Sequence, residues 1–120
     1  MELEKLKTIF LDIDGTLIYH YGFPRKQSFY EPVLLPGVEE KLNEWEEKGY
    51  RIILTTARKE SERELTIKQL SRLSIHYDLL IMGLNRGERI IINDMSPNSN
   101  ELRARAINVK RNKGLNNIEL

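Results

Sequence analysis

Two aspartates separated by one residue, Asp12 and Asp14, follow an apolar run and precede a glycine, Gly15. Residues i and i+2 of a strand point to the same side, so both carboxylates would face one site, and Gly15 lets the backbone turn sharply beside them. Carboxylates this close repel each other unless a cation lies between them or one holds a proton. The pair suits phosphoryl chemistry, in which Asp12 attacks phosphorus to form an aspartyl-phosphate and Asp14 gives and takes protons.

Further polar groups follow two other apolar runs, at residues 55–58 (Thr55, Thr56, Ala57 and Arg58) and 93–94 (Asn93 and Asp94). Hydroxyl and backbone N–H groups in the first segment can hold the non-bridging oxygens of a phosphate. We favour Thr56 over Thr55 for this role because Thr56 lies immediately before the turn into a helix. Arg58 can bind the phosphate or the substrate through its forked guanidinium. Asp94 is the expected second side-chain ligand of Mg²⁺, a cation that suits an all-oxygen site.

Five short apolar runs are the elements that would position these groups. Most are continuously apolar, as in strands covered on both faces, and they span residues 8–11, 51–55, 78–82, 89–92 and 106–109. A helix is expected between Pro36-Gly37 and Gly49, with an apolar stripe of Val38, Leu42 and Trp45. A second begins with a capping box at residues 61–64 and has an inner face of Ile67, Leu70 and Leu73. A short helix over about residues 98–105 would join the last two strands.

Strands that alternate with helices predict right-handed βαβ units and a parallel sheet. We therefore expect an α/β fold, a Rossmann-like three-layer sandwich with a five-stranded parallel sheet in the order 5-4-1-2-3. Such sheets bind ligands outside the carboxyl ends of their strands, where the strand order reverses. In this order the strands that precede the three polar groups are central neighbours, so the groups would converge on one point.

Composition restricts the function classes further. A chain of 120 residues allows one domain, and a net charge of +1 gives no bulk attraction to nucleic acid, so we do not expect a nucleic-acid partner. The absence of cysteine excludes thiolate metal sites and cysteine nucleophiles. The apolar runs are too short to span a bilayer, and the charged N-terminus is unlike a signal peptide. We expect a cytoplasmic protein with no membrane partner.

The segments 12–16 (Asp12-Ile13-Asp14-Gly15-Thr16), 56–58 and 91–94 resemble the first, second and fourth motifs of the haloacid dehalogenase (HAD) superfamily. The resemblance extends over about residues 7–111. It implies a Mg²⁺-dependent phosphatase in which Asp12 is the nucleophile, Asp14 is the acid and base with its carbonyl on the metal, and Asp94 is a metal ligand. The second aspartate of the first motif is typical of the phosphatases and mutases rather than the dehalogenases.

The third HAD motif, a basic residue before the fourth strand, has no lysine at the expected place. Arg86 is the best substitute, Arg89 is the next and Lys68 is a distant third. An arginine supplies the charge with a planar, forked geometry. The fourth motif carries Asn93 before Asp94 where two acids are common, which favours weaker metal binding.

Neither place at which HAD enzymes insert a cap domain is long enough here, so the chain resembles the capless group. We expect a flap at about residues 18–35, rich in aromatic side chains, that either touches the substrate or packs over the sheet edge. An exposed site also suggests a homo-oligomer, in which a neighbouring subunit closes it. The closing stretch at residues 106–115 is similar to small phosphatases associated with capsule and surface-polysaccharide synthesis.

That likeness makes a sugar phosphate or sugar-acid phosphate, a small phosphorylated metabolite, the first expected substrate. The second candidate is a nucleotide or polynucleotide end, with a phosphate backbone bound by a basic C-terminal face of Arg103, Arg105, Lys110, Arg111 and Lys113. The third is a degenerate module that binds without turnover.

Overall fold

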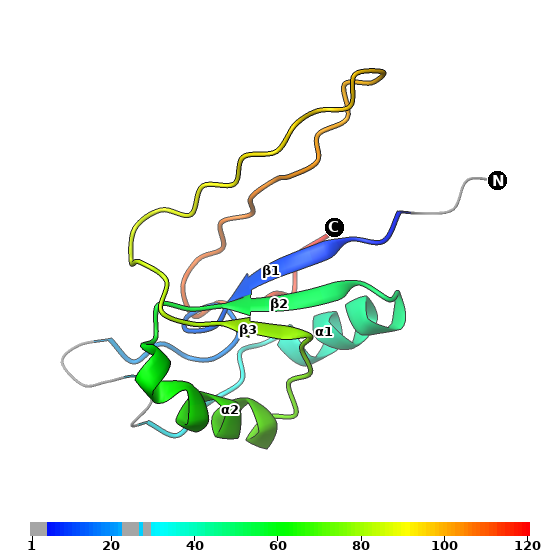
Figure 1. Cartoon of the computed structure of the whole chain (residues 1–120). Coiled ribbons are helices and arrows are strands. Elements are labelled where there is room, and N and C mark those ends of the chain that lie inside the picture. The colour runs from blue at the N-terminus through cyan, green and yellow to red at the C-terminus, as the bar shows by residue number, and fades with distance from the viewer. Residues whose placement is uncertain (1–4, 23–26, 28–29) are drawn as a thin grey trace.

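Three strands form one parallel sheet in the computed structural model, which describes residues 5–22, 27 and 30–120. The strands are β1 (Thr8–Asp12), β2 (Arg51–Thr55) and β3 (Leu79–Ile81), in the order β1-β2-β3. All three lie where the apolar runs predict them. The parallel register places Asp12 opposite Thr55 and Thr55 opposite Ile81, so the strands end at a common edge (Figure 1).

The helices are α1 (Val38–Glu47) and α2 (Arg63–Arg72), and a short 3-10 helix, η2 (Glu60–Glu62), precedes α2. The predicted stripe of α1 is confirmed, because Val38, Leu42 and Trp45 are its buried residues. The capping box expected at residues 61–64 does not form. No side-chain hydrogen bond caps α2, and η2 occupies the turn where the box was predicted.

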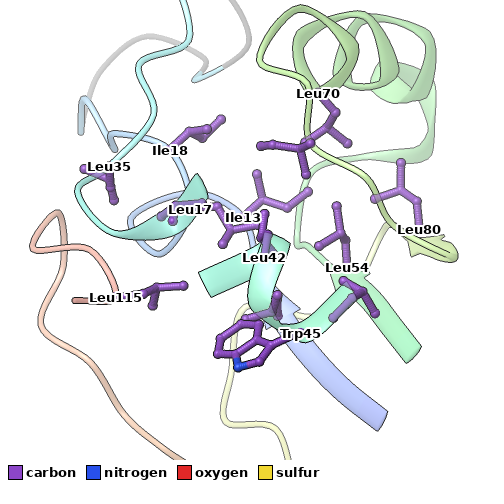
Figure 2. Close-up of a cluster of buried hydrophobic side chains, with 14 of the residues drawn as sticks. Ile13, Leu17, Ile18, Leu35, Leu42, Trp45, Leu54, Leu70, Leu80 and Leu115 are labelled. Carbon is purple, nitrogen blue, oxygen red and sulfur yellow. The ribbon is translucent and has the colours of Figure 1, made fainter. Parts of the chain in front are cut away.

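The core lies between the helices and one face of the sheet. Leu11, Leu54 and Leu80 are register neighbours on the three strands, and all three are buried. They pack in one cluster with Trp45 of α1 and Leu70 of α2 (Figure 2). Both helices therefore cover the same face of the sheet.

The opposite face of the sheet is open. Phe10, Ile53 and Leu79 form the next row of register neighbours, and because side chains alternate along a strand they point away from the helices. Phe10 is 54% exposed and Leu79 is 46% exposed, whereas Ile53 between them is 8% exposed. The described chain is thus a two-layer α/β structure whose second sheet face carries no helix and is exposed on both sides of Ile53.

The prediction of a five-stranded sheet in a three-layer sandwich is wrong. Residues 89–92 and 106–109 pair with no strand, and residues 98–105 form no helix. Residues 85–108 instead form an extended, exposed arm, which projects from the sheet and helices (Figure 1, yellow to orange). The Cα radius of gyration is 15.5 Å, against about 13.5 Å for a compact chain of this length.

Chain length explains why the fourth strand does not form beside β1. Consecutive parallel strands need a crossover of about a dozen residues or more. Residues 82–88, between the end of β3 and the expected fourth strand, are too few. Residues 89–92 have the apolar composition of a strand, but composition does not supply the connection that a parallel strand needs.

The inner face of α2 also differs from the prediction. Ile67 is 41% exposed, whereas Thr66 and Gln69 are buried together with Leu70. The helix turns these two polar side chains inward because they bind a buried arginine, described below.

Residues 109–120 return from the arm to the core. Leu115 is buried in the cluster of Figure 2. Its backbone N–H donates to the carbonyl of Pro36 at 2.9 Å. Gly114 has φ +82°, and a Cβ there would lie 2.0 Å from the Pro36 oxygen, so only glycine fits. Within the described part of the chain, no helix combines the length and apolarity that a membrane span requires.

Candidate functional site

The loop after β1 holds Asp12 and Asp14 at the carboxyl edge of the sheet. Its turn is closed by hydrogen bonds from the Gly15 N–H to the Ile18 carbonyl at 2.7 Å and from the Leu17 N–H to the Ile13 carbonyl at 2.9 Å. Gly15 has φ +88°, a conformation that disfavours residues with a Cβ. The backbone thus turns sharply directly after the two carboxylates, as the sequence predicts.

Arg58 binds Asp14 through both prongs of its guanidinium. Nε donates to Oδ2 of Asp14 at 2.9 Å, and Nη2 donates to Oδ1 at 2.7 Å. The remaining nitrogen, Nη1, donates to Thr66 Oγ1 at 3.1 Å and to Gln69 Oε1 at 2.6 Å. The Arg58 side chain is 5% exposed and that of Asp14 is 15% exposed. The buried Arg58 side chain therefore connects the loop after β1 to α2 through hydrogen bonds. It is not exposed to bind a ligand in the way that the sequence predicted.

The hydroxyl next to Asp12 is neither of the two that the sequence favours. Thr56 is 2% exposed, and its Oγ1 accepts from the Arg58 backbone N–H at 3.1 Å. Thr55 lies opposite Asp12 in the register, and its Oγ1 donates to the Leu11 carbonyl at 3.3 Å. Thr16 Oγ1 donates to Asp12 Oδ2 at 3.1 Å. Thr16 is the last residue of the pentapeptide 12–16, four residues after Asp12. Its membership of that motif could have marked it as the hydroxyl that contacts Asp12.

The environment of Asp12 disfavours its ionised form. Burial raises the pKa of the Asp12 carboxyl above its ordinary value, and the charge of Asp14 acts in the same direction. The Thr16 hydrogen bond and the charge of Arg89 lower the pKa of Asp12, but they do not offset the burial. Asp12 is nevertheless exposed at the edge of the sheet, so a substrate can reach it. A reachable carboxylate with a raised pKa beside a second acid is typical of a reactive group.

The sequence offers Arg86 first and Arg89 second as the basic residue of the third motif. In the structure it is the charge of Arg89 that acts on Asp12, which favours Arg89 for this role. Because Arg89 lowers the pKa of Asp12, we expect Arg89→Gln to shift the acid limb of the pH profile of kcat/KM to higher pH. Arg86→Gln should leave that limb in place. The measurement is phosphate release over about pH 3 to 8, a range that spans the titration of a carboxyl group. Equal shifts in the two variants would contradict the assignment to Arg89.

The expected ligands of Mg²⁺ are not brought together within one chain. Asp94 lies on the arm, with its side chain 77% exposed and 3.6 Å from Arg103. Both carboxylate oxygens of Asp14 accept hydrogen bonds from Arg58. Among the described residues, no group of three or more His, Asp or Glu side chains is placed to hold a metal ion. One chain as it stands does not fit the three-ligand site that the resemblance implies.

The C-terminal segment reaches the same loop, which the sequence analysis did not anticipate. The Asn112 backbone N–H donates to the Gly15 carbonyl at 2.8 Å, and the Asn112 side chain binds both backbone groups of His20. The side chain of Arg111 lies over Gly15, where a Cβ would be 3.1 Å from its Cγ. A second arginine thus borders the loop. Arg111 belongs to the run of basic residues near the C-terminus, which is the feature of the sequence that could have indicated its place beside this loop.

The flap expected at residues 18–35 is described only in part, because residues 23–26 and 28–29 lie outside the described residues. Its two ends pair through an antiparallel bridge between Ile18 and Leu34. The rings of Tyr21 and Tyr30 stack at 4.3 Å between centroids. Contact of this segment with a substrate stays a prediction.

Comparisons with known proteins place the fold near components of an RNA repair assembly. Chains in solved structures of the Pnkp1/Rnl/Hen1 RNA repair complex and of the Pnkp1/Rnl/Hen1 complex match with TM-scores of 0.56 and 0.54 and 30% identity in each case. The matches cover 70% and 71% of this chain, but 28% and 31% of those chains, so it spans less than a third of their length. No family model and no curated protein matches the chain.

Proposed function

We propose that this chain is a phosphomonoesterase of the HAD type, in which Asp12 is the nucleophile. The observation that carries the proposal is the setting of Asp12, an exposed carboxylate at the carboxyl edge of a parallel sheet, whose Oδ2 accepts from the Thr16 hydroxyl and on which the charge of Arg89 acts. Ligands of open α/β sheets bind at this edge. The order of the motifs along the sequence agrees with this assignment.

In the proposed reaction, an Asp12 oxygen bonds to phosphorus while the ester P–O bond breaks and the alcohol leaves with a proton. Water then hydrolyses the aspartyl-phosphate, which releases phosphate and restores the carboxylate. Arg89 is the proposed source of positive charge on the transferring group, since its charge already acts on Asp12. Asp14 is the proposed acid and base. It accepts two hydrogen bonds from Arg58, which fix its orientation. In the proposed cycle Asp14 must first take up a proton and release one of these hydrogen bonds; it then gives the proton to the leaving alcohol and regains one from the water that hydrolyses the aspartyl-phosphate.

Mg²⁺ is the proposed cation, and it would neutralise charge on the transferring phosphoryl group. Asp12, at the carboxyl edge of the sheet, is the carboxylate that we propose as its ligand. Asp94 of the same chain is not.

The proposed substrate is the phosphorylated end of an RNA strand. Support comes from the likeness to chains of an RNA repair complex and from Arg111, which borders the loop after β1. A site at an open sheet edge admits a large substrate, and arginines suit phosphate groups. The sugar-phosphate alternative has its support in the likeness of residues 106–115 to capsule-associated phosphatases, and no described contact favours it.

Phosphate release from four substrates at equal concentration with Mg²⁺ tests the proposal. These are a 3′-phosphorylated oligoribonucleotide, its 5′-phosphorylated counterpart, a hexose 6-phosphate and p-nitrophenyl phosphate. We expect the highest kcat/KM with one of the oligonucleotides, by about tenfold or more, because extra phosphates add electrostatic contacts. That preference should shrink as the salt concentration rises.

A higher kcat/KM with the hexose phosphate would contradict the RNA assignment and leave the phosphatase assignment intact. No phosphate release from any of the four substrates would contradict the phosphatase assignment and favour the degenerate binding module.

A further inference from the structure

We propose that a cluster of tyrosine rings beside the loop after β1 binds the base of the terminal nucleotide of an RNA strand, and that Tyr19 is the ring on which this base stacks. The tyrosine cluster consists of Tyr19, Tyr21 and Tyr30. The inference rests on the proposed function, in which the substrate is a phosphorylated RNA end, and it assigns the part of the chain that holds the nucleoside.

The rings of the tyrosine cluster pack against one another and leave one ring accessible. Tyr21 stacks on Tyr30 with 4.3 Å between the centroids and 14° between the planes. Tyr19 contacts Tyr21 edge to face, at 4.9 Å and 71°. Tyr21 and Tyr30 are partly buried, whereas Tyr19 is 41% exposed. Tyr19 is therefore the ring that a flat ligand can reach.

Tyr19 is attached to the loop that holds Asp12. It directly follows Ile18, whose carbonyl accepts from the Gly15 N–H at 2.7 Å and which forms a parallel bridge with Asp14. A terminal nucleotide carries its phosphate and its base on the same sugar, so its base must bind beside the phosphate site. The place of Tyr19 in the chain meets this requirement.

A cation borders the same loop. His20 follows Tyr19, and the Asn112 side chain binds the His20 backbone N–H at 2.7 Å and the His20 carbonyl at 3.0 Å. The neighbouring Arg111 lies over Gly15. An exposed aromatic ring next to a cation is the combination that binds single-stranded nucleic acid, in which the cation attracts the phosphates and the ring stacks on a base.

Helix α2 holds the tyrosine cluster in place. The Tyr21 hydroxyl donates to the Glu31 carbonyl at 2.9 Å, and the Glu31 carboxylate pairs with Arg72 at 2.7 Å. Nε2 of Gln69 donates to the Tyr30 carbonyl at 3.2 Å. A binding surface that is already ordered loses less conformational entropy when its ligand binds.

The same helix fixes the cluster relative to the proposed acid and base. Gln69, which binds the carbonyl of Tyr30, also accepts from Nη1 of Arg58 at 2.6 Å. Arg58 in turn holds Asp14 through two hydrogen bonds. One side chain of α2 thus connects the tyrosine cluster to the arginine that orients Asp14.

A nucleobase is the ligand that suits these groups. Every base has a flat π-face, and loss of one base–aromatic stack lowers the affinity by about fivefold or more. RNA-binding proteins commonly hold unpaired bases of single strands on tyrosine rings. A hexose has no π-face, so a hexose phosphate would gain no such stacking from Tyr19.

Fluorescence anisotropy tests the contact without reference to activity. The probes are short oligoribonucleotides with a 3′- or a 5′-phosphate, each labelled at its other end and titrated with the intact chain in EDTA to stop turnover. We expect Tyr19→Leu to raise the Kd of the better probe by about fivefold or more. Tyr19→Phe keeps the ring and should bind like the wild type. Phe10→Leu is the matched control, because it removes an exposed ring outside the tyrosine cluster, and it should also bind like the wild type.

An unchanged Kd in Tyr19→Leu would overturn the proposal, and so would a wild-type chain that binds neither probe. An equal rise of the Kd in Phe10→Leu would also overturn it, because the loss would then not be specific to the tyrosine cluster.

A probe without its terminal base separates stacking from phosphate contacts. It keeps every phosphate but offers Tyr19 no ring, so the wild type should bind it as weakly as Tyr19→Leu binds the complete probe. Tyr19→Leu should lose no further affinity for it. If removal of the base weakened the wild type and Tyr19→Leu by the same factor, the base would not contact Tyr19 and the proposal would be overturned.

Phosphate release keeps this inference separate from the proposed function. Wild-type turnover of an oligonucleotide together with an unchanged Kd in Tyr19→Leu would refute the base-binding site alone. A raised Kd in Tyr19→Leu, with no phosphate release from any substrate, would refute the phosphatase assignment and support the base-binding site.

Discussion

Asp12→Asn is expected to abolish phosphate release, by a factor of about 10³ or more, and to leave the fold intact. An amide cannot form the aspartyl-phosphate, and loss of a covalent nucleophile has effects of this size. Burial raises the pKa of Asp12, which means that the folded chain disfavours the ionised carboxyl. The variant should therefore unfold at a temperature equal to or above that of the wild type at neutral pH. This difference should disappear in acid, where the wild-type carboxyl is protonated in both states.

Asp78→Asn is the matched control. Asp78 Oδ2 accepts from the Ile52 backbone N–H at 2.8 Å at the start of β3, so its carboxylate supports the sheet. We expect this variant to unfold at a lower temperature and to keep its kcat. An Asp12→Asn variant with the activity of the wild type would contradict the assignment of the nucleophile.

Arg58→Met is expected to lower the free energy of unfolding by about 3–5 kcal/mol, the usual cost of removing one partner of a buried ion pair. The substitution leaves Asp14 without the two Arg58 hydrogen bonds that it accepts, and it leaves Thr66 and Gln69 without theirs. Urea denaturation followed by circular dichroism measures the loss. Adding Asp14→Asn should restore part of the stability, because the cost comes from an uncompensated carboxylate.

Arg63→Met is the matched control, because it removes an exposed arginine–carboxylate pair where Arg58→Met removes a buried one. Arg63 also forms a forked pair with a carboxylate, to Glu60 at 2.7 and 2.9 Å, but that pair is exposed. Exposed ion pairs contribute little because water screens them. We therefore expect a much smaller shift of the urea midpoint, and an equal loss in the two variants would contradict the structural role of Arg58.

The first two-thirds of the fold followed from local patterns. The stripe of α1 and the three apolar runs of the sheet could be predicted from the order of the residues, because the spacing of apolar positions is a local property of each helix or strand. The last third did not follow. Residues 89–92 have the composition of a strand, but pairing depends on how far the connection from Leu84 can reach, which is a property of the whole topology.

The part of the site that lies within one short motif, residues 12–16, could be predicted from the sequence. The loop that holds Asp12 and Asp14 turns at Gly15 as the pentapeptide indicates. The buried role of Arg58 was not predictable, since nothing local distinguishes an arginine that binds phosphate from one that binds Asp14. Thr66 and Gln69 were not among the predicted inner residues of α2, because a helical pattern of apolar residues does not reveal which polar side chains face a buried charge.

Trapping the covalent intermediate tests the central claim most directly. The chain is mixed with its best substrate, quenched in acid within a turnover and analysed by peptide mass spectrometry. We predict one added phosphoryl group on the peptide that contains Asp12, reversed by hydroxylamine, and no such group in Asp12→Asn. A phosphoryl group on another residue, or full turnover by Asp12→Asn with no modified peptide, would contradict the account.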